Sequence, residues 1–179
     1  QPNEVIFDAK TPLDGRDTPI RSMQTNLGQV ITKAMSFAFE DKVDCALVNG
    51  GSIRIDDQLS GPITAVDIFR VLPYGGGVLK VGIKGRLLER VLNYGIEAQG
   101  KGAYLQRFNA KKLDKIWMIK NRPLDKSKTY TVAFSDYLLK GLDIPFLTSN
   151  NSGISSVIHP KNKELAFDIR KVVINYLKT

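Results

Sequence analysis

The sequence VDCALVNGGSIR, residues 43–54, decides the fold, because an apolar run there ends abruptly in a polar, glycine-rich loop. The run 43–48 is predicted to form a buried strand. Glycine after Asn49 lets the backbone take positive φ and lets a ligand approach with no Cβ in the way. Ligand sites in α/β sheets lie where strands end, so Asn49, Gly51 and Arg54 could bind an anion or a planar polar molecule. A plain turn with a solvated arginine is the alternative, and spacing alone favours it.

The length and composition indicate an ordinary globular protein. The chain has 179 residues, of which 42% are hydrophobic and 25% charged. This length suits one domain with its own core, or at most two small ones. No run approaches the ~20 consecutive apolar residues that a membrane span needs. Gln1 resembles a cut end, so we expect a signal segment or a preceding domain before it.

The charged and reactive residues exclude several kinds of site. The net charge of +8 favours anionic partners, and nucleic acid is the disfavoured alternative among them. Cys45 is the only cysteine and is predicted to be a buried packing residue. His159 is the only histidine, so neither a histidine-rich metal site nor a Cys/His pair can be built. We therefore predict no catalytic residue and no metal ligand in this chain.

Periodicity and capping signals predict one mixed α/β domain. A helix over 26–40 would be capped by Thr25 or Asn26, and 64–67 resembles a capping box. A turn is expected at 12–15 and a final helix from about residue 162. The other expected helix is 86–98, and strands are expected at 4–8, 43–48, 78–83, 103–108, 115–120 and 129–134.

Three loops, 49–54, 73–77 and 141–151, compete as a binding site. Tyr74 and Phe146 lie in two of them, and two such rings could sandwich a flat heterocycle. Base stacking on an aromatic ring is worth ~1–3 kcal/mol per base. Ordinary packing is the alternative for each ring. No phosphate loop or dinucleotide fingerprint is present. The serines have no histidine base nearby in sequence, so the loops offer binding chemistry and no convincing reactive centre.

Several motifs together carry a family likeness. In order along the chain they are RSMQTNLG (21–28), NGGSIR (49–54), GPIT (61–64), VLPYGG (71–76) and YTVA (130–133), which is followed by YL (137–138). They resemble the C-terminal domain of the 5'-nucleotidase family, which includes UDP-sugar hydrolase and 2',3'-cyclic-nucleotide phosphodiesterase. The likeness covers nearly the whole chain.

The resemblance implies a substrate-specificity domain with a four-layer α/β/β/α arrangement spanning 1–179. It also implies an N-terminal metallophosphatase domain, absent from this chain, that holds two divalent metal ions. That domain would hydrolyse phosphoric esters, in the same or a separate chain, while this chain alone would not be catalytic. The family is periplasmic, cell-surface or secreted, and the same compartments are expected here.

The family's substrate contacts map onto particular residues of this sequence. The base would stack between Tyr74 and Phe146, and Arg21, Asn49 and Arg54 would contact the ribose and phosphate. The full predicted substrate-binding set is Arg21, Asn49, Gly51, Arg54, Tyr74, Gly76, Phe146 and Asn151.

The sequence departs from the family pattern in the third loop. The family's Gly-Gly-Asp-Gly-aromatic motif reads GLDIPF at 141–146, one residue longer and with two glycines lost. The acidic residue that holds the ribose hydroxyls falls among Asn150, Asn151 and Ser152, where a neutral amide could still hydrogen-bond a hydroxyl.

Three functional hypotheses remain open at this point. The first is the nucleotide-recognition domain of a nucleotide phosphohydrolase. The second is a free-standing binding protein that either partners a separate metallophosphatase or is a non-catalytic nucleotide-binding module. The third is a basic nucleic-acid-binding module, which would show strongly salt-dependent affinity for long strands.

Overall fold

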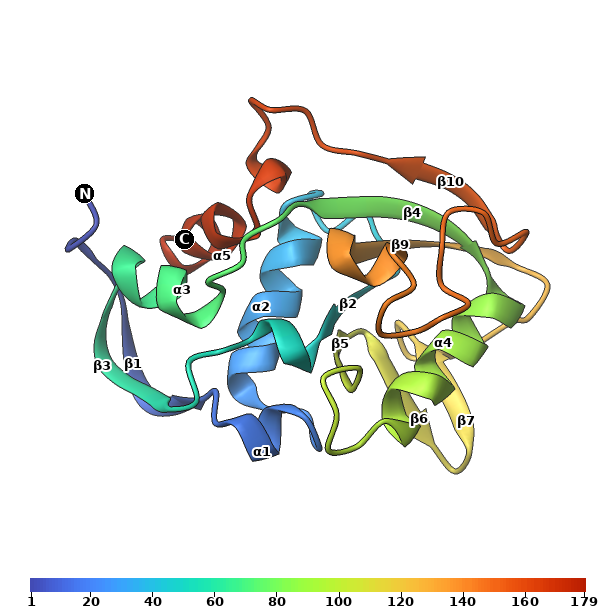
Figure 1. The fold of residues 1–179 in the computed structure, drawn as a ribbon, viewed down its shortest axis with the longest axis horizontal. Coiled ribbons are helices and arrows are strands. Elements are labelled where there is room, and N and C mark those ends of the chain that lie inside the picture. Colours follow the sequence, from blue (N-terminus) through green and yellow to red (C-terminus); the bar gives the residue numbers. More distant parts are fainter.

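A five-stranded sheet forms the centre of the protein in a computed structural model that describes all 179 residues (Figure 1). The strand order is β10-β4-β9-β2-β5. Only β2 and β9 run parallel, and every other pair is antiparallel. The bounds are β2 (Cys45–Asn49), β4 (Val78–Lys84), β5 (Leu105–Phe108), β9 (Thr129–Ser135) and β10 (Ile154–Ile158).

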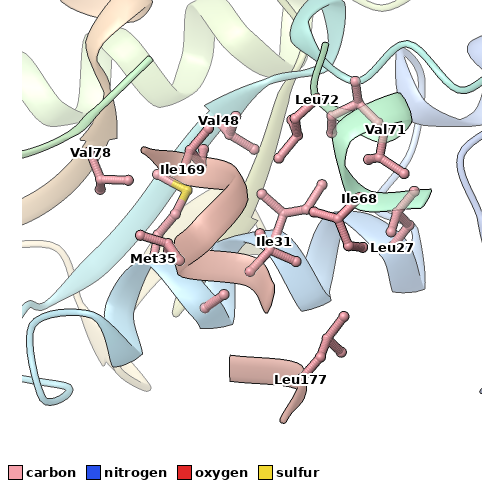
Figure 2. Close-up of a cluster of buried hydrophobic side chains, with 14 of the residues drawn as sticks. Leu27, Ile31, Met35, Val48, Ile68, Val71, Leu72, Val78, Ile169 and Leu177 are labelled. Atoms are coloured by element: carbon pink, nitrogen blue, oxygen red, sulfur yellow. The ribbon is translucent and has the colours of Figure 1, made fainter. Parts of the chain in front are cut away.

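Helices cover both faces of this sheet. On one face α2 (Asn26–Phe37) packs against β2 and β5, and α5 (Ile169–Leu177) packs against α2. Figure 2 shows the resulting core, in which Leu27, Ile31 and Met35 of α2 meet residues of the sheet, of α5 and of α3 (Ala65–Val71). On the other face α4 (Gly85–Glu97) buries a second apolar cluster. None of these helices has both the length and the apolarity needed to cross a bilayer.

Two smaller sheets and four short helical segments complete the fold. The strands β1 (Val5–Asp14) and β3 (Gln58–Thr64) form a two-stranded sheet, at the left of Figure 1. The second small sheet has the order β6-β7-β8, and Trp117 of β7 is buried in the same cluster as α4. The remaining bounds are β6 (Ala110–Leu113), β7 (Ile116–Ile119), β8 (Arg122–Pro123), α1 (Asp17–Ile20) and the 3-10 turns Gly50–Ser52, Asp136–Leu139 and Leu165–Phe167.

The predicted mixed α/β fold is confirmed, while two local predictions are wrong. No turn forms at 12–15, because β1 continues to Asp14. Its pairing with β3 shifts register between Ala9 and Leu13, and such an irregularity accommodates Pro12 within a strand. The last helix begins at Ile169 and not near residue 162, because the Asp168 side chain accepts a hydrogen bond from the backbone N of Arg170 and caps it there.

The capping box at α3 is confirmed and gives a first stability prediction. Thr64 Oγ1 accepts from the backbone N of Asp67 at 3.4 Å, and Asp67 Oδ2 accepts from the backbone N of Thr64 at 2.8 Å. A Thr64→Ala variant should lose about 1 kcal/mol of unfolding free energy in urea denaturation, since an N-cap side chain is removed. Thr64→Ser keeps the hydroxyl and should lose less than half as much; equal losses would contradict the capping role.

Candidate functional site

The Asn-Gly-Gly turn after β2 is fixed by close backbone contacts. The backbone N of Gly50 donates to the carbonyl of Tyr104 at 2.7 Å, and that of Gly51 donates to Gly102 at 2.9 Å. Neither glycine has positive φ, so the positive φ expected after Asn49 is wrong. A Cβ on Gly51 would instead lie 2.9 Å from the Cα of Gly102. The turn therefore needs glycine so that a second backbone segment can lie against it.

A cavity of about 530 Å³ opens beside this turn. Two of its walls are the 72–76 loop and the residues that follow β9. Its lining residues are Asn49, Gly51, Ser52, Leu72, Tyr74, Gly75, Gly76, Gly102, Ser135, Asp136, Tyr137, Lys140, Asp143 and Ile169.

The 72–76 loop turns sharply and presents Tyr74 at the cavity. Gly75 and Gly76 have φ of 66° and 91°, a region that favours glycine. A Cβ on Gly76 would lie 2.7 Å from Asp136 Oδ1, while Asp136 Oδ2 accepts from the backbone N of Gly77 at 2.8 Å. Tyr74 is 73% exposed, so much of its ring is free to contact a ligand.

Asn49 joins three segments of the cavity wall. Its Nδ2 donates to Asp143 Oδ2 at 3.1 Å, and its Oδ1 accepts from Ser135 Oγ at 3.3 Å. Its backbone carbonyl accepts from Ser52 Oγ at 2.9 Å. Asn49 is only 3% exposed, so its amide chiefly holds these neighbours in place. Burial raises the pKa of Asp143, while the Asn49 hydrogen bond and the positive charge of Arg21 act in the opposite direction.

Arg21 has an unused donor close to this cluster. Its Nε is buried and has no hydrogen-bond partner. Its charge acts on Asp143, although Arg21 is not one of the residues that line the cavity. An unpaired guanidinium donor in a partly buried position is suited to an anionic ligand.

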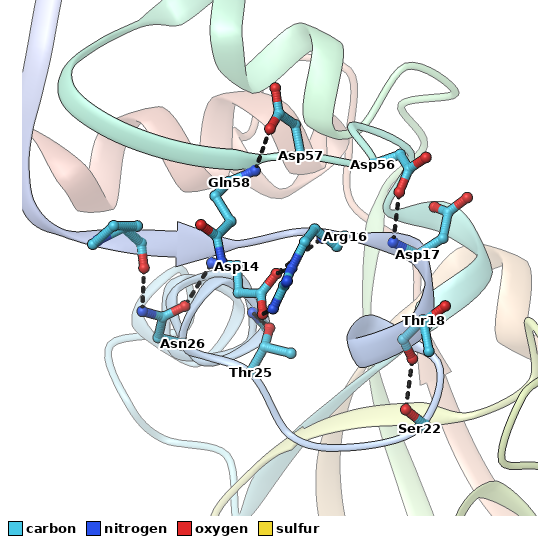
Figure 3. Close-up of polar contacts among 12 residues, drawn as sticks. Asp14, Arg16, Asp17, Thr18, Ser22, Thr25, Asn26, Asp56, Asp57 and Gln58 are labelled. Atoms are coloured by element: carbon cyan, nitrogen blue, oxygen red, sulfur yellow. Dashed lines mark hydrogen bonds and ion pairs between the residues drawn. The ribbon is translucent and has the colours of Figure 1, made fainter.

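The segment that leads to Arg21 is held by polar contacts at Asp14 and at Asp17 (Figure 3). Asn26 Oδ1 accepts from the backbone N of Asp14 at 2.7 Å, and Asp56 Oδ1 accepts from the backbone N of Asp17 at 2.9 Å. Asp56 thereby anchors the start of α1. Asn26 at the start of α2 and the more distant Asp56 thus hold the residues before Arg21.

The predicted site residues fall into two groups. Asn49, Gly51, Tyr74 and Gly76 line one cavity together. Arg54 is exposed and does not line it, although its backbone N donates to the carbonyl of Val71 at 2.8 Å and so ties the turn to the Tyr74 loop.

Phe146 and Asn151 lie elsewhere. The Phe146 ring packs edge-on against Tyr94 of α4, with 5.7 Å between centroids, and beneath the Arg90 guanidinium at 4.3 Å. Asn151 Nδ2 donates to the carbonyl of Phe146 at 2.9 Å, and its Oδ1 accepts from the backbone N of Gly153. The apolar surface of α4 thus takes up the Phe146 ring, and neither residue lines the cavity of Tyr74.

Sequence reasoning missed Ser135, Asp136, Tyr137 and Asp143. Ser135 is the last residue of β9, the parallel neighbour of β2, and Asp136 and Tyr137 follow it directly. Carboxyl ends of parallel strands meet at one edge of a sheet, so a prediction of that pairing would have placed them beside Asn49. Tyr137 is the second aromatic residue that lines the cavity, and Phe146 does not line it.

The chain offers little to a metal ion or a thiol mechanism. No group of three or more His, Cys, Asp or Glu residues is placed to hold a metal ion. Cys45 is fully buried, and burial raises the pKa of its thiol far above the ordinary value, with a further rise from Asp44. A thiol in that state is not a nucleophile.

Comparison with known proteins gives a consistent set of relatives. A family model described as "5'-nucleotidase, C-terminal domain" matches residues 5–148. The 5'-nucleotidase of Rattus norvegicus is 29% identical over 161 residues, which covers 73% of this chain and 28% of the rat protein. Protein UshA of Yersinia enterocolitica is 31% identical over 140 residues, covering 73% of this chain and 24% of UshA.

Solved structures resemble the whole chain. The 5'-nucleotidase precursor from Thermus thermophilus gives a TM-score of 0.79 at 26% identity over 98% of this chain. The match covers 36% of the Thermus chain. This chain therefore spans between 24% and 36% of the length of these three proteins.

Proposed function

Since the chain belongs to the 5'-nucleotidase C-terminal domain family, we propose that it is the nucleotide-recognition part of a nucleotide phosphohydrolase. The observation that carries the proposal is the cavity between the Asn49 turn and the Tyr74 loop. It combines an exposed aromatic ring, which suits the flat base of a nucleoside, with buried polar groups, which suit its sugar.

The base is proposed to stack on Tyr74. The ring is 73% exposed at the cavity and stands on a loop whose turn is fixed by Asp136. Tyr137, also exposed and also lining the cavity, is the second ring available to the base. Each stacked aromatic ring contributes ~1–3 kcal/mol to the binding of a base.

The ribose and phosphate are proposed to meet the polar groups. Asp136 and Asp143 line the cavity and can accept hydrogen bonds from sugar hydroxyls, the role expected from the sequence near Asn151. Arg21, whose charge acts on Asp143, has a free Nε, and Arg54 is exposed beyond the Asn49 turn. Both guanidinium groups can pair with a phosphate.

The hydrolytic step is proposed to belong to another domain. The residues of this chain do not fit the two divalent metal ions that the family resemblance implies, because no donor cluster is present. A metallophosphatase domain, in the same or a separate chain, would supply them in the periplasm, at the cell surface or outside the cell. The part played by this chain is to bind and orient the nucleotide.

Calorimetry with adenosine, AMP and UDP-glucose tests the binding proposal. We expect weak binding of at least one of them, and Tyr74→Ala should weaken it about tenfold because the stacking surface is lost. Tyr74→Phe keeps the ring and is the matched control, with a change below about twofold. Unchanged affinity in Tyr74→Ala would place the base elsewhere, and AMP hydrolysis by the chain with divalent metal would contradict the division of labour.

A further inference from the structure

A second cavity, of about 510 Å³, lies at the start of α4 and shares no lining residue with the first. Lys84, Arg86 and Arg90 come from the end of β4 and from α4, and Lys126 comes from the turn before β9. No acidic residue lines it, and Leu87 is its only apolar residue. We call it the basic cavity.

Three of its four cations have no ionic partner. Lys126 Nζ lies 3.5 Å from Glu89 Oε1, whereas Lys84, Arg86 and Arg90 form no salt bridge. Arg90 is held with its Cζ 4.3 Å from the centroid of the Phe146 ring. Stacking on a ring leaves the in-plane N–H donors of a guanidinium free for an anion.

Backbone contacts fix the walls that carry these side chains. The backbone N of Gly85 donates to the carbonyl of Lys128 at 2.7 Å, and that of Arg86 donates to Lys126 at 3.0 Å. A Cβ on Gly85 would collide with the carbonyl of Asp125, so the two segments touch. Because these bonds occupy the first two amides of α4, neither of them is free for a ligand, and the charged donors of the cavity are those of its side chains.

The third wall is the segment 151–153, which is tied to the same place. The backbone N of Lys84 donates to the carbonyl of Gly153 at 2.8 Å, and Asn151 Oδ1 accepts from the backbone N of Gly153 at 2.8 Å. Asn151 and Phe146, which the sequence suggested for the nucleotide site, therefore border the basic cavity or support its arginine.

We propose that the basic cavity binds a phosphate anion with more than one negative charge, as a pyrophosphate or a phosphate-bearing headgroup presents. Four cations around one hollow favour a multiply charged anion over a carboxylate, and arginine forks match phosphate oxygens. The cavity has no aromatic lining residue to stack a base, so its ligand is the anion itself and not a nucleoside.

Calorimetry with pyrophosphate at about 0.1 M salt tests this inference. The variant Lys84→Gln/Arg86→Gln removes two exposed, unpaired cations and should weaken binding about tenfold. Lys161→Gln/Lys163→Gln removes the same charge from an exposed segment outside the cavity and should change affinity less than about twofold. Absence of saturable binding, or equal weakening in both variants, would overturn the proposal.

Two further measurements identify the source of the phosphate and separate the two cavities. Sedimentation with phosphatidic acid vesicles, whose phosphate monoester can carry more than one negative charge, against phosphatidylcholine vesicles, tests a headgroup. Binding that pyrophosphate displaces supports a headgroup, and pyrophosphate binding without vesicle binding supports a soluble anion. If vesicles bound equally well to the Lys84→Gln/Arg86→Gln variant and pyrophosphate did not bind at all, both the headgroup and the soluble anion would be refuted as ligands of the basic cavity. Adenosine affinity should be the same in this variant and the unmodified chain, since Lys84 and Arg86 do not line the first cavity.

Discussion

A Gln106→Leu variant is expected to lose about 3–5 kcal/mol of unfolding free energy, since three buried or part-buried polar groups lose their partner. Gln106 lies on β5 and is fully buried. Its Nε2 donates to the carbonyls of Ile20 at 2.8 Å and Met23 at 2.7 Å, and its Oε1 accepts from the backbone N of Thr25 at 3.1 Å. Leucine nearly matches the volume of glutamine but satisfies none of these groups, each of which costs ~1–3 kcal/mol when left unpaired.

Urea denaturation of the variant measures this loss. Gln58→Leu is the matched control, because Gln58 is exposed on β3 and its side chain makes no hydrogen bond in the structure; its change should stay within about 0.5 kcal/mol. A loss below about 1 kcal/mol in Gln106→Leu would mean that the segment before α2 finds other partners. Because Arg21 lies in that segment, the same variant should also weaken nucleotide binding.

Features governed by neighbouring residues could be predicted from the sequence. Thr25 Oγ1 accepts from the backbone N of Gly28 at 3.1 Å and caps α2 as expected, and the capping box at Thr64 forms. These signals depend on side chains that reach only three residues along the chain. The apolar period of α2 likewise marks the face that the structure buries.

Features that depend on distant contacts could not be predicted. The residues near Gln106 in sequence do not reveal that its side chain packs against Gly28, where a Cβ would clash with it. Nor do they reveal that this side chain forms hydrogen bonds with residues 20–25. Pro12 looked like a turn because its strand partner, β3, was not recognised.

The candidate site divides along the same line. The sequence pointed to Asn49 and Tyr74, which line the cavity, because each stands in a glycine-rich loop. Tyr137 and Asp143 were missed because their position depends on the parallel pairing of β2 with β9 and on one hydrogen bond from Asn49. Phe146 does not line this cavity because its ring packs against Tyr94 of α4, a contact that the loop sequence does not reveal.

An Asn49→Ala variant is expected to lose about 2–3 kcal/mol of unfolding free energy at neutral pH. It removes the Asn49 Nδ2 that donates to Asp143 and the Asn49 Oδ1 that accepts from Ser135 Oγ. The Asp143 carboxylate then remains partly buried without its amide partner. Hydrogen bonds to charged groups contribute ~1.5–3 kcal/mol, more than bonds between neutral groups. Nucleotide affinity should fall as well, because Asn49, Ser135 and Asp143 all line the cavity.

The pH dependence of this loss separates the charge of Asp143 from simple packing. Burial already raises the pKa of Asp143, and removing the opposing Asn49 hydrogen bond should raise it further. A raised carboxyl pKa means that folding favours the protonated form, so the group carries no penalty below its unfolded pKa and destabilises the fold as pH rises through the folded pKa.

The loss in Asn49→Ala should therefore be larger at about pH 7 than at about pH 4, because a raised pKa increases the protonated fraction of the Asp143 carboxyl at the lower pH. Urea denaturation at both values measures the difference, and acid effects on other groups cancel between variant and unmodified chain. In an Asp143→Asn background the pH dependence should vanish while the packing loss remains. If the loss in Asn49→Ala were the same at both pH values, Asn49 would stabilise the fold through packing, and its hydrogen bond to the Asp143 carboxylate would contribute nothing.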